Sequence, residues 1–205
     1  MNPKLPRCPL LLAALCGALL SGCASQGQQA ALLYDFGALP VSSGEAVSTI
    51  PPLVVTDVSG SSLLDSPAIT YRLNYADPLQ ARAYANSRWS STPLQLLTQR
   101  ITTRIAQAGV KVLAVTDATA GALLLRIDAD AFSQNFDSPS QSKGEVVLRV
   151  SAFRGHTLVD QRSFAHSVSA ASADAAGGVR ALAAATDATA ADILQWLAAL
   201  PPPKQ

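Results

Sequence analysis

The side chains best suited to acid–base chemistry are Arg126, Asp128, Asp130, His156 and His166. Asp128 and Asp130 are two residues apart, and on a β-strand this spacing puts both carboxylates on one face. Proton transfer by a carboxylate pair needs burial that separates the two pKa values. The alternating pattern puts these groups on the solvent face, so we interpret the cluster as a solvated strand surface with local ion pairs.

Sequence motifs for other chemistry are incomplete. The two histidines have no further ligands at a spacing known for metal sites. Ser59-Gly60-Ser61-Ser62 lacks the G-x-S-x-G pattern of a catalytic serine and indicates a loop. Gly177-Gly178 lacks the strand and spacing of a dinucleotide-binding motif, and indicates a turn or a fraying point of a helix. We therefore expect no catalytic residue, no metal and no cofactor in a protein that is not an enzyme.

Cys23 is the residue for which the sequence predicts a modification. Lys4 and Arg7 precede the apolar stretch LLLAALCGALL, as in an export signal. The residues that follow, Leu20 to Cys23 (LSGC), resemble the lipobox of bacterial lipoproteins. This resemblance implies cleavage between Gly22 and Cys23, with Cys23 acylated as the first mature residue. An ordinary secretory signal that contains a cysteine by chance is the alternative.

The signal also bears on location. Its apolar stretch is too short to span a bilayer, which takes about 20 apolar residues. Each buried CH₂ of an acyl chain contributes about 0.8 kcal/mol, so several chains on Cys23 anchor a domain firmly. Residue 24 is Ala and not the Asp that favours inner-membrane retention in Gram-negative lipoproteins. The resemblance therefore implies an outer-membrane anchor and a domain that faces the periplasm.

The composition limits the remaining chain to one domain with few chemical options. Removal of residues 1–22 from 205 leaves 183, enough for one core. It also removes Lys4 and Arg7, which leaves 13 basic residues against 14 acidic ones and excludes nucleic acid as a partner on charge grounds. Cys8 and Cys16 leave with the signal, so no thiol remains for a disulfide once Cys23 is acylated.

The predicted organisation has four parts. Residues 1–22 form the lipoprotein signal peptide, and residues 23–32 form a lipidated tether rich in small polar side chains. At about 3.3 Å per residue this tether spans roughly 30 Å at most. Residues 33–200 form the periplasmic domain, and residues 201–205 form a tail.

Two helices are expected in the domain. Thr92-Pro93-Leu94-Gln95 combines an N-cap, a proline at the first helical position and a glutamine three residues after the cap, which predicts a helix over 93–108 that ends at Gly109. An alanine-rich segment with an apolar stripe predicts a second helix over 174–199, ended by three prolines.

The strands and the fold class follow from the remaining apolar runs. Alternation in 123–130 and 146–153, with Gly155 at a turn before a strand over 157–168, predicts an antiparallel meander. Shorter strands are expected at 32–36, 53–58, 68–75, 80–88 and 110–115. We predict an α+β single domain, an antiparallel sheet with two main helices packed on it.

An aromatic-rich segment is the candidate contact surface. Tyr71, Tyr75, Tyr84 and Trp89 are four of the eleven Phe, Tyr and Trp residues in the chain. Tyrosine and tryptophan combine a large apolar area with a polar group, which suits an interface. Packing within the core of the sheet also explains them, and the sequence leaves both explanations open.

Several segments together resemble the ABC-type transport auxiliary lipoprotein family. They are the lipobox, YDFG (Tyr34 to Gly37), LVVTDV (Leu53 to Val58), ITYRL…LQARAYANSRW (Ile69 to Trp89), PLQLLTQRI and the long carboxy-terminal helix. The resemblance covers most of the mature chain, although residues 38–52 carry no strong family feature and leave the pairing of the first strand open.

The resemblance implies a non-enzymatic role in envelope transport. The expected partner is an MCE-domain protein of the inner membrane that bridges the periplasm and moves phospholipid, and the lipoprotein would dock the outer-membrane end of that bridge. A homo-oligomeric ring is compatible with such a bridge. The alternatives are a structural or lipopolysaccharide-assembly lipoprotein, a substrate-binding lipoprotein, and a lipid-anchored hydrolase.

Overall fold

The computed structural model describes residues 30–39, 48–117 and 121–201. The chain divides into Met1–Ala30 and a folded unit, Ala31–Gln205, and only the second is described below. The predictions for the signal peptide, for Gly22 and for Cys23 concern residues outside the described part of the chain.

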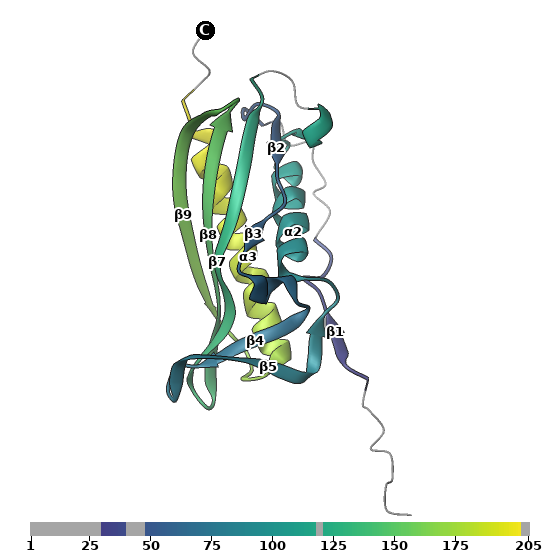
Figure 1. The fold of residues 1–205 in the computed structure, drawn as a ribbon, viewed down its shortest axis with the longest axis vertical. Coiled ribbons are helices and arrows are strands. Elements are labelled where there is room, and N and C mark those ends of the chain that lie inside the picture. The colour runs from purple at the N-terminus through teal and green to yellow at the C-terminus, as the bar shows by residue number, and fades with distance from the viewer. Residues whose placement is uncertain (1–29, 40–47, 118–120, 202–205) are drawn as a thin grey trace, which may run out of the picture. The chain divides into compact units, whose positions relative to one another are not determined.

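A long antiparallel meander forms one side of the sheet, with β9 at its edge (Figure 1). It consists of β7 (Leu123–Ser138), β8 (Gln141–Arg154) and β9 (Thr157–Ser169). Gly155 turns the chain between β8 and β9 with a φ of 58°, a conformation that favours glycine. The meander is confirmed, and its first two strands extend beyond 123–130 and 146–153 into a polar segment.

The other edge of β7 is shared by three short strands that run parallel to it. β2 (Leu53–Val55) pairs with residues 123–125, β3 (Ser59–Gly60) with 128–129, and β4 (Ala68–Leu73) with 134–136. The segment expected to be a loop after Val58 thus contributes a short strand. Ser61 then caps a 3-10 helix, η1 (Ser62–Asp65).

Three further strands complete a mixed sheet. β4 forms an antiparallel hairpin with β5 (Asp77–Trp89), and β1 (Leu32–Tyr34) adds to β5 in parallel. β6 (Val112–Leu113) pairs with β2 and is followed by a second 3-10 helix, η2 (Val115–Asp117), so the strand expected over 110–115 is short. The α+β fold class is confirmed, with a sheet that is antiparallel in its meander and hairpin and parallel elsewhere.

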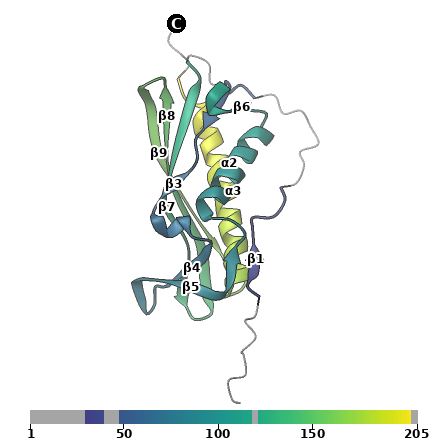
Figure 2. The same ribbon diagram turned by 45° about the vertical axis from the view of Figure 1, so that its right-hand side comes forward.

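Both helices lie on one face of the sheet (Figures 1 and 2). α2 (Pro93–Gln107) begins with the expected capping box of Thr92 and Gln95. α3 (Ala175–Ala198) begins after Asp174, whose carboxylate accepts a hydrogen bond from the Gly177 amide at 2.7 Å. No helix among the described residues is both long and apolar enough to cross a membrane.

The core lies between this face of the sheet and the two helices. Its members are apolar side chains at alternate positions of β7 and β8 and on the stripes of α2 and α3. They include Leu125, Ile127, Leu148, Val150, Leu97, Ile101, Leu182 and Ile193.

Gly177 and Gly178 lie inside α3, so their interpretation as a turn or fraying point is wrong. Both are buried in the first turn of the helix. A Cβ on Gly178 would lie 2.1 Å from Oε1 of Gln134, and a Cβ on Gly177 would lie 2.0 Å from the Ser172 carbonyl oxygen. The two glycines let the start of α3 lie directly against β7 and the preceding loop.

Candidate docking surfaces

The residues considered for acid–base chemistry are not brought together. Asp128 and Asp130 lie on the face of β7 away from the helices, where Asp130 pairs with Arg149 at 3.1 Å. His166 faces the helices and contacts Asp192 of α3 at 2.8 Å, whereas His156 is exposed in the β8–β9 turn. Within the described ranges, no group of three or more His, Cys, Asp or Glu residues is placed to hold a metal ion.

Trp89 belongs to the core. Its side chain is only 2% exposed, and its ring packs against Phe36 at 5.5 Å and Phe132 at 5.7 Å between centroids. The β5 strand ends here beside β1, which brings the early Phe36 over the tryptophan. A partner cannot reach this side chain in the folded domain.

Tyr71 and Tyr84 pack on each other across the β4–β5 hairpin, with ring centroids 4.6 Å apart. The Tyr84 hydroxyl donates to Oε1 of Gln134 at 2.9 Å, and burial raises the pKa of Tyr84 to about 12, with the nearby Tyr71 and Asp174 adding to the shift. Both rings are half-buried, so they serve mainly to fix the hairpin to β7.

Gln134 is the centre of a polar junction that the sequence did not indicate. It is fully buried, and its amide nitrogen donates to Ser142 Oγ at 2.8 Å and to the Asp174 carbonyl at 3.2 Å. It therefore joins β7, β8, the hairpin and the start of α3. The sequence does carry one signal for this burial. Phe132 and Phe136 lie two positions to either side of Gln134, and apolar residues at alternate positions indicate a strand whose buried face includes residue 134.

A second junction missed by the sequence analysis joins the two helices. Asp187 of α3 accepts hydrogen bonds from Arg100 at 2.7 and 2.8 Å and from Arg104 at 2.9 Å. Burial alone would raise the pKa of Asp187, but the hydrogen bonds from Arg104 and Arg100 outweigh it and hold this pKa below its ordinary value. The same contact raises the pKa of Arg104.

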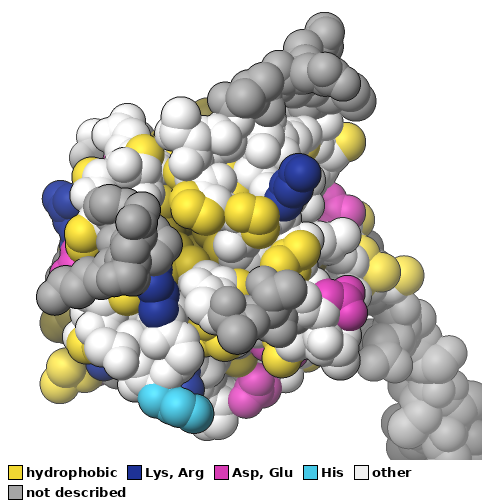
Figure 3. All heavy atoms as spheres, turned by 90° about the horizontal axis from the view of Figure 1, so that it is seen from above, with side chains coloured by type: hydrophobic (Ala, Val, Ile, Leu, Met, Phe, Trp, Pro, Cys, Tyr) yellow, Lys and Arg dark blue, Asp and Glu magenta, His cyan; other side chains and the backbone are white. Residues whose placement is uncertain are grey.

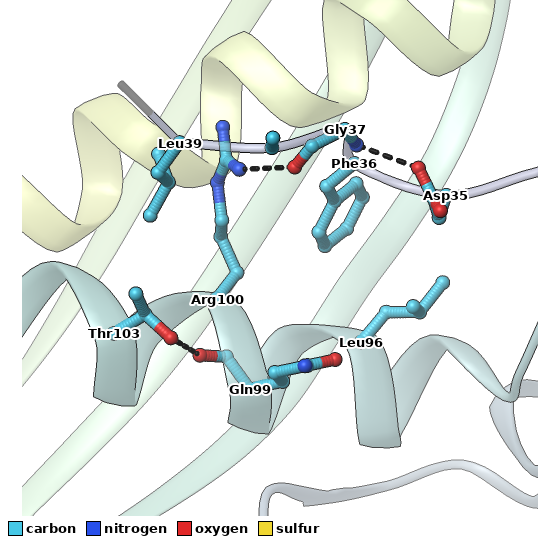
Figure 4. Close-up of a pocket in the computed structure, with 9 residues that line it drawn as sticks. Asp35, Phe36, Gly37, Leu39, Leu96, Gln99, Arg100 and Thr103 are labelled. Atoms are coloured by element: carbon cyan, nitrogen blue, oxygen red, sulfur yellow. Dashed lines mark hydrogen bonds between the residues drawn. The ribbon is translucent and has the colours of Figure 1, made fainter. Parts of the chain in front are cut away.

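A cavity of about 350 Å³ lies beside this junction, under the segment that follows β1 (Figure 4). Arg100 reaches across it and donates to the Gly37 carbonyl at 2.9 Å, while the Gly37 amide donates to Asp35 at 2.7 Å. Because the guanidinium already bonds Gly37 and Asp187, we assign it to holding residues 35–39 on α2 and not to binding a ligand.

Six of the seven large apolar side chains that are exposed among the described residues lie toward the two ends of the folded unit, and the seventh, Leu63, lies on η1. The lower end in Figure 1 carries the β4–β5 hairpin and the start of β1, and Tyr75 is exposed there at the hairpin turn. The upper end carries η2, the β8–β9 turn and the end of α3, with Val115 64% and Leu158 49% exposed. Figure 3 looks down on the upper end and shows hydrophobic side chains gathered near its centre. Of the four aromatic candidates, only Tyr75 remains available for direct contact.

Solved structures share this fold. Protein XCC0632 from Xanthomonas campestris, of the DUF330 family, superposes with a TM-score of 0.67 at 18% identity, over 81% of this chain and 94% of that chain. A second structure, of an uncharacterized protein, gives a TM-score of 0.63 at 15% identity, over 82% of this chain and 98% of that one. At these identities the likeness concerns the fold alone.

Sequence comparison adds the family. No curated protein sequence matches the chain. The family model of the ABC-type transport auxiliary lipoprotein component matches residues 34–194, which include β5, α2, the entire meander and most of α3. The chain therefore belongs to the ABC-type transport auxiliary lipoprotein family.

Proposed function

We propose that this protein is a lipid-anchored, non-enzymatic subunit that docks the outer-membrane end of an MCE-type phospholipid transport bridge. The observation that carries the proposal is the family match over residues 34–194, because the family is that of an auxiliary component of ABC-type transport. The anchor in this proposal is Cys23, acylated after cleavage behind Gly22, with the domain in the periplasm.

The upper end is the surface that we propose for docking. The anchor precedes β1, and β1 begins at the lower end of the folded unit. A partner that approaches from the inner membrane would meet the opposite end, where Leu158 next to the β8–β9 turn and Val115 on η2 each expose an apolar side chain. Contact of a protein partner with Tyr75 stays a prediction for the lower end.

The experiment is affinity capture of the tagged, full-length lipoprotein from gently solubilised envelopes, with identification of the proteins and lipids that copurify. We expect an MCE-domain protein. Recovery of lipopolysaccharide-assembly or cell-wall proteins in its place would contradict the proposal.

Paired variants locate the docking surface. Leu158→Asp or Val115→Asp should lower recovery of the partner, whereas Leu63→Asp should leave it unchanged, because Leu63 is exposed at 43% but lies on η1, away from the upper end. If Tyr75→Ser loses the partner and the upper-end variants keep it, the docking surface is the hairpin and not the upper end.

Anchoring is tested separately with Cys23→Ser. This variant should take up no labelled palmitate and should leave the outer-membrane fraction. Incorporation of label at the level of the native chain would contradict acylation at Cys23.

A further inference from the structure

The β4–β5 hairpin holds one leucine away from the protein in a defined bulge. Arg72 pairs with Ala81 and Leu73 pairs with Asp77, so three residues of β5, Pro78 to Gln80, have no partner on β4. Leu79, in the middle of this bulge, is 89% exposed, the highest value among the exposed large hydrophobic side chains of the described residues.

Specific hydrogen bonds fix the shape of the bulge. The Arg72 guanidinium donates to the carbonyls of Pro78 and Leu79 at 3.1 and 3.2 Å, and Asp77 accepts from the Leu79 amide at 2.9 Å. These bonds satisfy the carbonyls of Pro78 and Leu79 and the Leu79 amide, while the leucine side chain is left in water. This arrangement presents an apolar group that the fold itself does not use.

More apolar side chains lie at the same end of the molecule. β5 crosses the lower end, with the hairpin on one side and β1 on the other (Figure 1). Leu32 and Leu33 of β1 are 60% and 68% exposed, and Tyr75 at the hairpin turn is 48% exposed. Together with Leu79 they place apolar groups at both ends of one strand.

The same two strands carry an excess of positive charge. β4 and β5 contain Arg72, Arg82 and Arg88 against one carboxylate, Asp77. Arg82 is exposed between the two apolar positions, and Arg88 is exposed opposite Leu33 of β1. None of the ion pairs within the described residues involves these three arginines. Apolar groups beside unpaired basic groups match the boundary between acyl chains and anionic headgroups.

The length of the chain in front of β1 limits where this end can lie. From Cys23 to Leu32 there are nine residue steps, which span roughly 30 Å when fully extended. An acylated Cys23 therefore keeps the lower end within that distance of the bilayer.

We propose that the lower end rests on the leaflet that holds the anchor, with Leu79, Tyr75, Leu32 and Leu33 entering the interface of an anionic phospholipid membrane and Arg82 and Arg88 contacting headgroup phosphates. This inference rests on the proposed lipid anchor and adds a second membrane contact that sets the orientation of the domain. The upper end then points into the periplasm.

The test uses the acylated mature protein in vesicles of phosphatidylethanolamine with a minor share of phosphatidylglycerol. Cys8 and Cys16 leave with the signal and Cys23 is acylated, so an introduced cysteine is the one free thiol. An environment-sensitive fluorophore is attached to Leu79→Cys, with Val115→Cys at the upper end and Leu63→Cys on η1 as controls. Brominated lipid in the vesicles quenches only labels that contact acyl chains.

We expect quenching and a blue shift at position 79 and neither at positions 63 and 115. Arg82→Gln and Arg88→Gln should each reduce the ratio of lipid-contacting to free hairpins about fivefold, since a basic side chain near an anionic surface contributes about 1 kcal/mol. Vesicles without phosphatidylglycerol should reduce it in the same direction.

Flotation of the vesicles reports whether the protein is bound to them, and so separates the proposed lipid anchor from the proposed contact of the lower end with the membrane. Protein that floats but shows no quenching at position 79 overturns this inference and leaves the anchor intact. Crosslinking of position 79 to a protein in envelopes, without quenching in vesicles, also overturns it in favour of a protein partner. Protein that does not float overturns the anchor, and the inference that depends on it.

Discussion

The polar junctions inside the domain and the apolar groups at its ends invert the usual distribution of side chains. Gln134 and Asp187 are polar residues placed where elements meet, and each is fully hydrogen-bonded by neighbours from other elements. Leu79 and Val115 are apolar residues that contact water. The first pair specifies how strands and helices fit together, whereas the second pair is free for contacts with other molecules.

This contrast predicts two classes of variant. Changes at the junctions should alter the free energy of unfolding, and changes at the ends should alter binding while the unfolding free energy stays constant.

The largest effect is expected for Asp187→Ala. The change leaves Arg100, whose side chain is 9% exposed, without its carboxylate, and should lower the free energy of unfolding by about 3 kcal/mol in chemical denaturation. Asp130→Ala is the control, since its pair with Arg149 is exposed and should contribute less than about 1 kcal/mol. Equal losses in the two variants would remove the distinction.

The same carboxylate gives a pH dependence. The pKa of Asp187 is below 3.8 in the folded chain, so its contribution is complete above that value and is lost as the pH falls through the folded-state pKa. The difference in unfolding free energy between the native chain and Asp187→Asn should be constant near neutral pH and shrink below about pH 4. A difference that persists at lower pH would assign the loss to packing.

Gly178→Ala should lower the free energy of unfolding by about 2 kcal/mol, because the new Cβ displaces the Gln134 side chain from its hydrogen bonds. A double-mutant cycle with Gln134→Ala tests the cause. In that background the space is free, and the alanine should be neutral or slightly stabilising through its higher helix propensity. An unchanged cost would locate the clash elsewhere.

Tyr84→Phe should lower the free energy of unfolding by about 1 kcal/mol, because it removes the hydrogen bond to Gln134. Because the folded-state pKa is about 12 against an ordinary 10, the Tyr84 contribution is complete below pH 10 and is lost as the pH rises toward 12. The free energy of unfolding of the native chain should exceed that of Tyr84→Phe below pH 10, and this difference should disappear as the pH approaches 12. Tyr75→Phe, at the exposed turn, should leave the free energy of unfolding at neutral pH unchanged.

The smallest effect on stability is expected for Leu79→Ser, within about 0.5 kcal/mol of the native chain in thermal unfolding, because the side chain touches water and little else. A marked loss would mean that the bulge packs against the fold and is not presented for contact.

The sequence predicts those elements whose signals are local. The capping box of Thr92 and Gln95 locates α2 to within one residue, and alternation together with Gly155 identifies the meander. The parallel pairing of β2, β3 and β4 along β7 is not predictable in this way, because strands of two to six residues carry no local information about a distant partner.

The polar junctions are missed for a related reason. Gln134 lies in a run of polar residues that resembles a loop, and its burial depends on Tyr84, Ser142 and Asp174 arriving from three other segments. Asp187 lies in an alanine-rich helix, and its charge beside the apolar stripe is the one sign that it has a partner. Its sequence surroundings do not identify that partner as the arginines of α2. The aromatic segment was ambiguous because Trp89 and Tyr75, near its two ends, have opposite environments.

The shared edge of β7 has a consequence for the order in which the domain folds. β2, β3 and β4 are synthesised some 60 to 70 residues before the strand that they pair with, as in Val55 with Leu125 or Tyr71 with Gln134. Such contacts of long sequence separation form slowly. A chain released before residue 123 would therefore hold the β4–β5 hairpin with β1, the short β2–β6 pair and α2, but not the strand that joins them. Their apolar faces would stay uncovered, and the synthesis of β7 is the step that lets the amino-terminal half assemble.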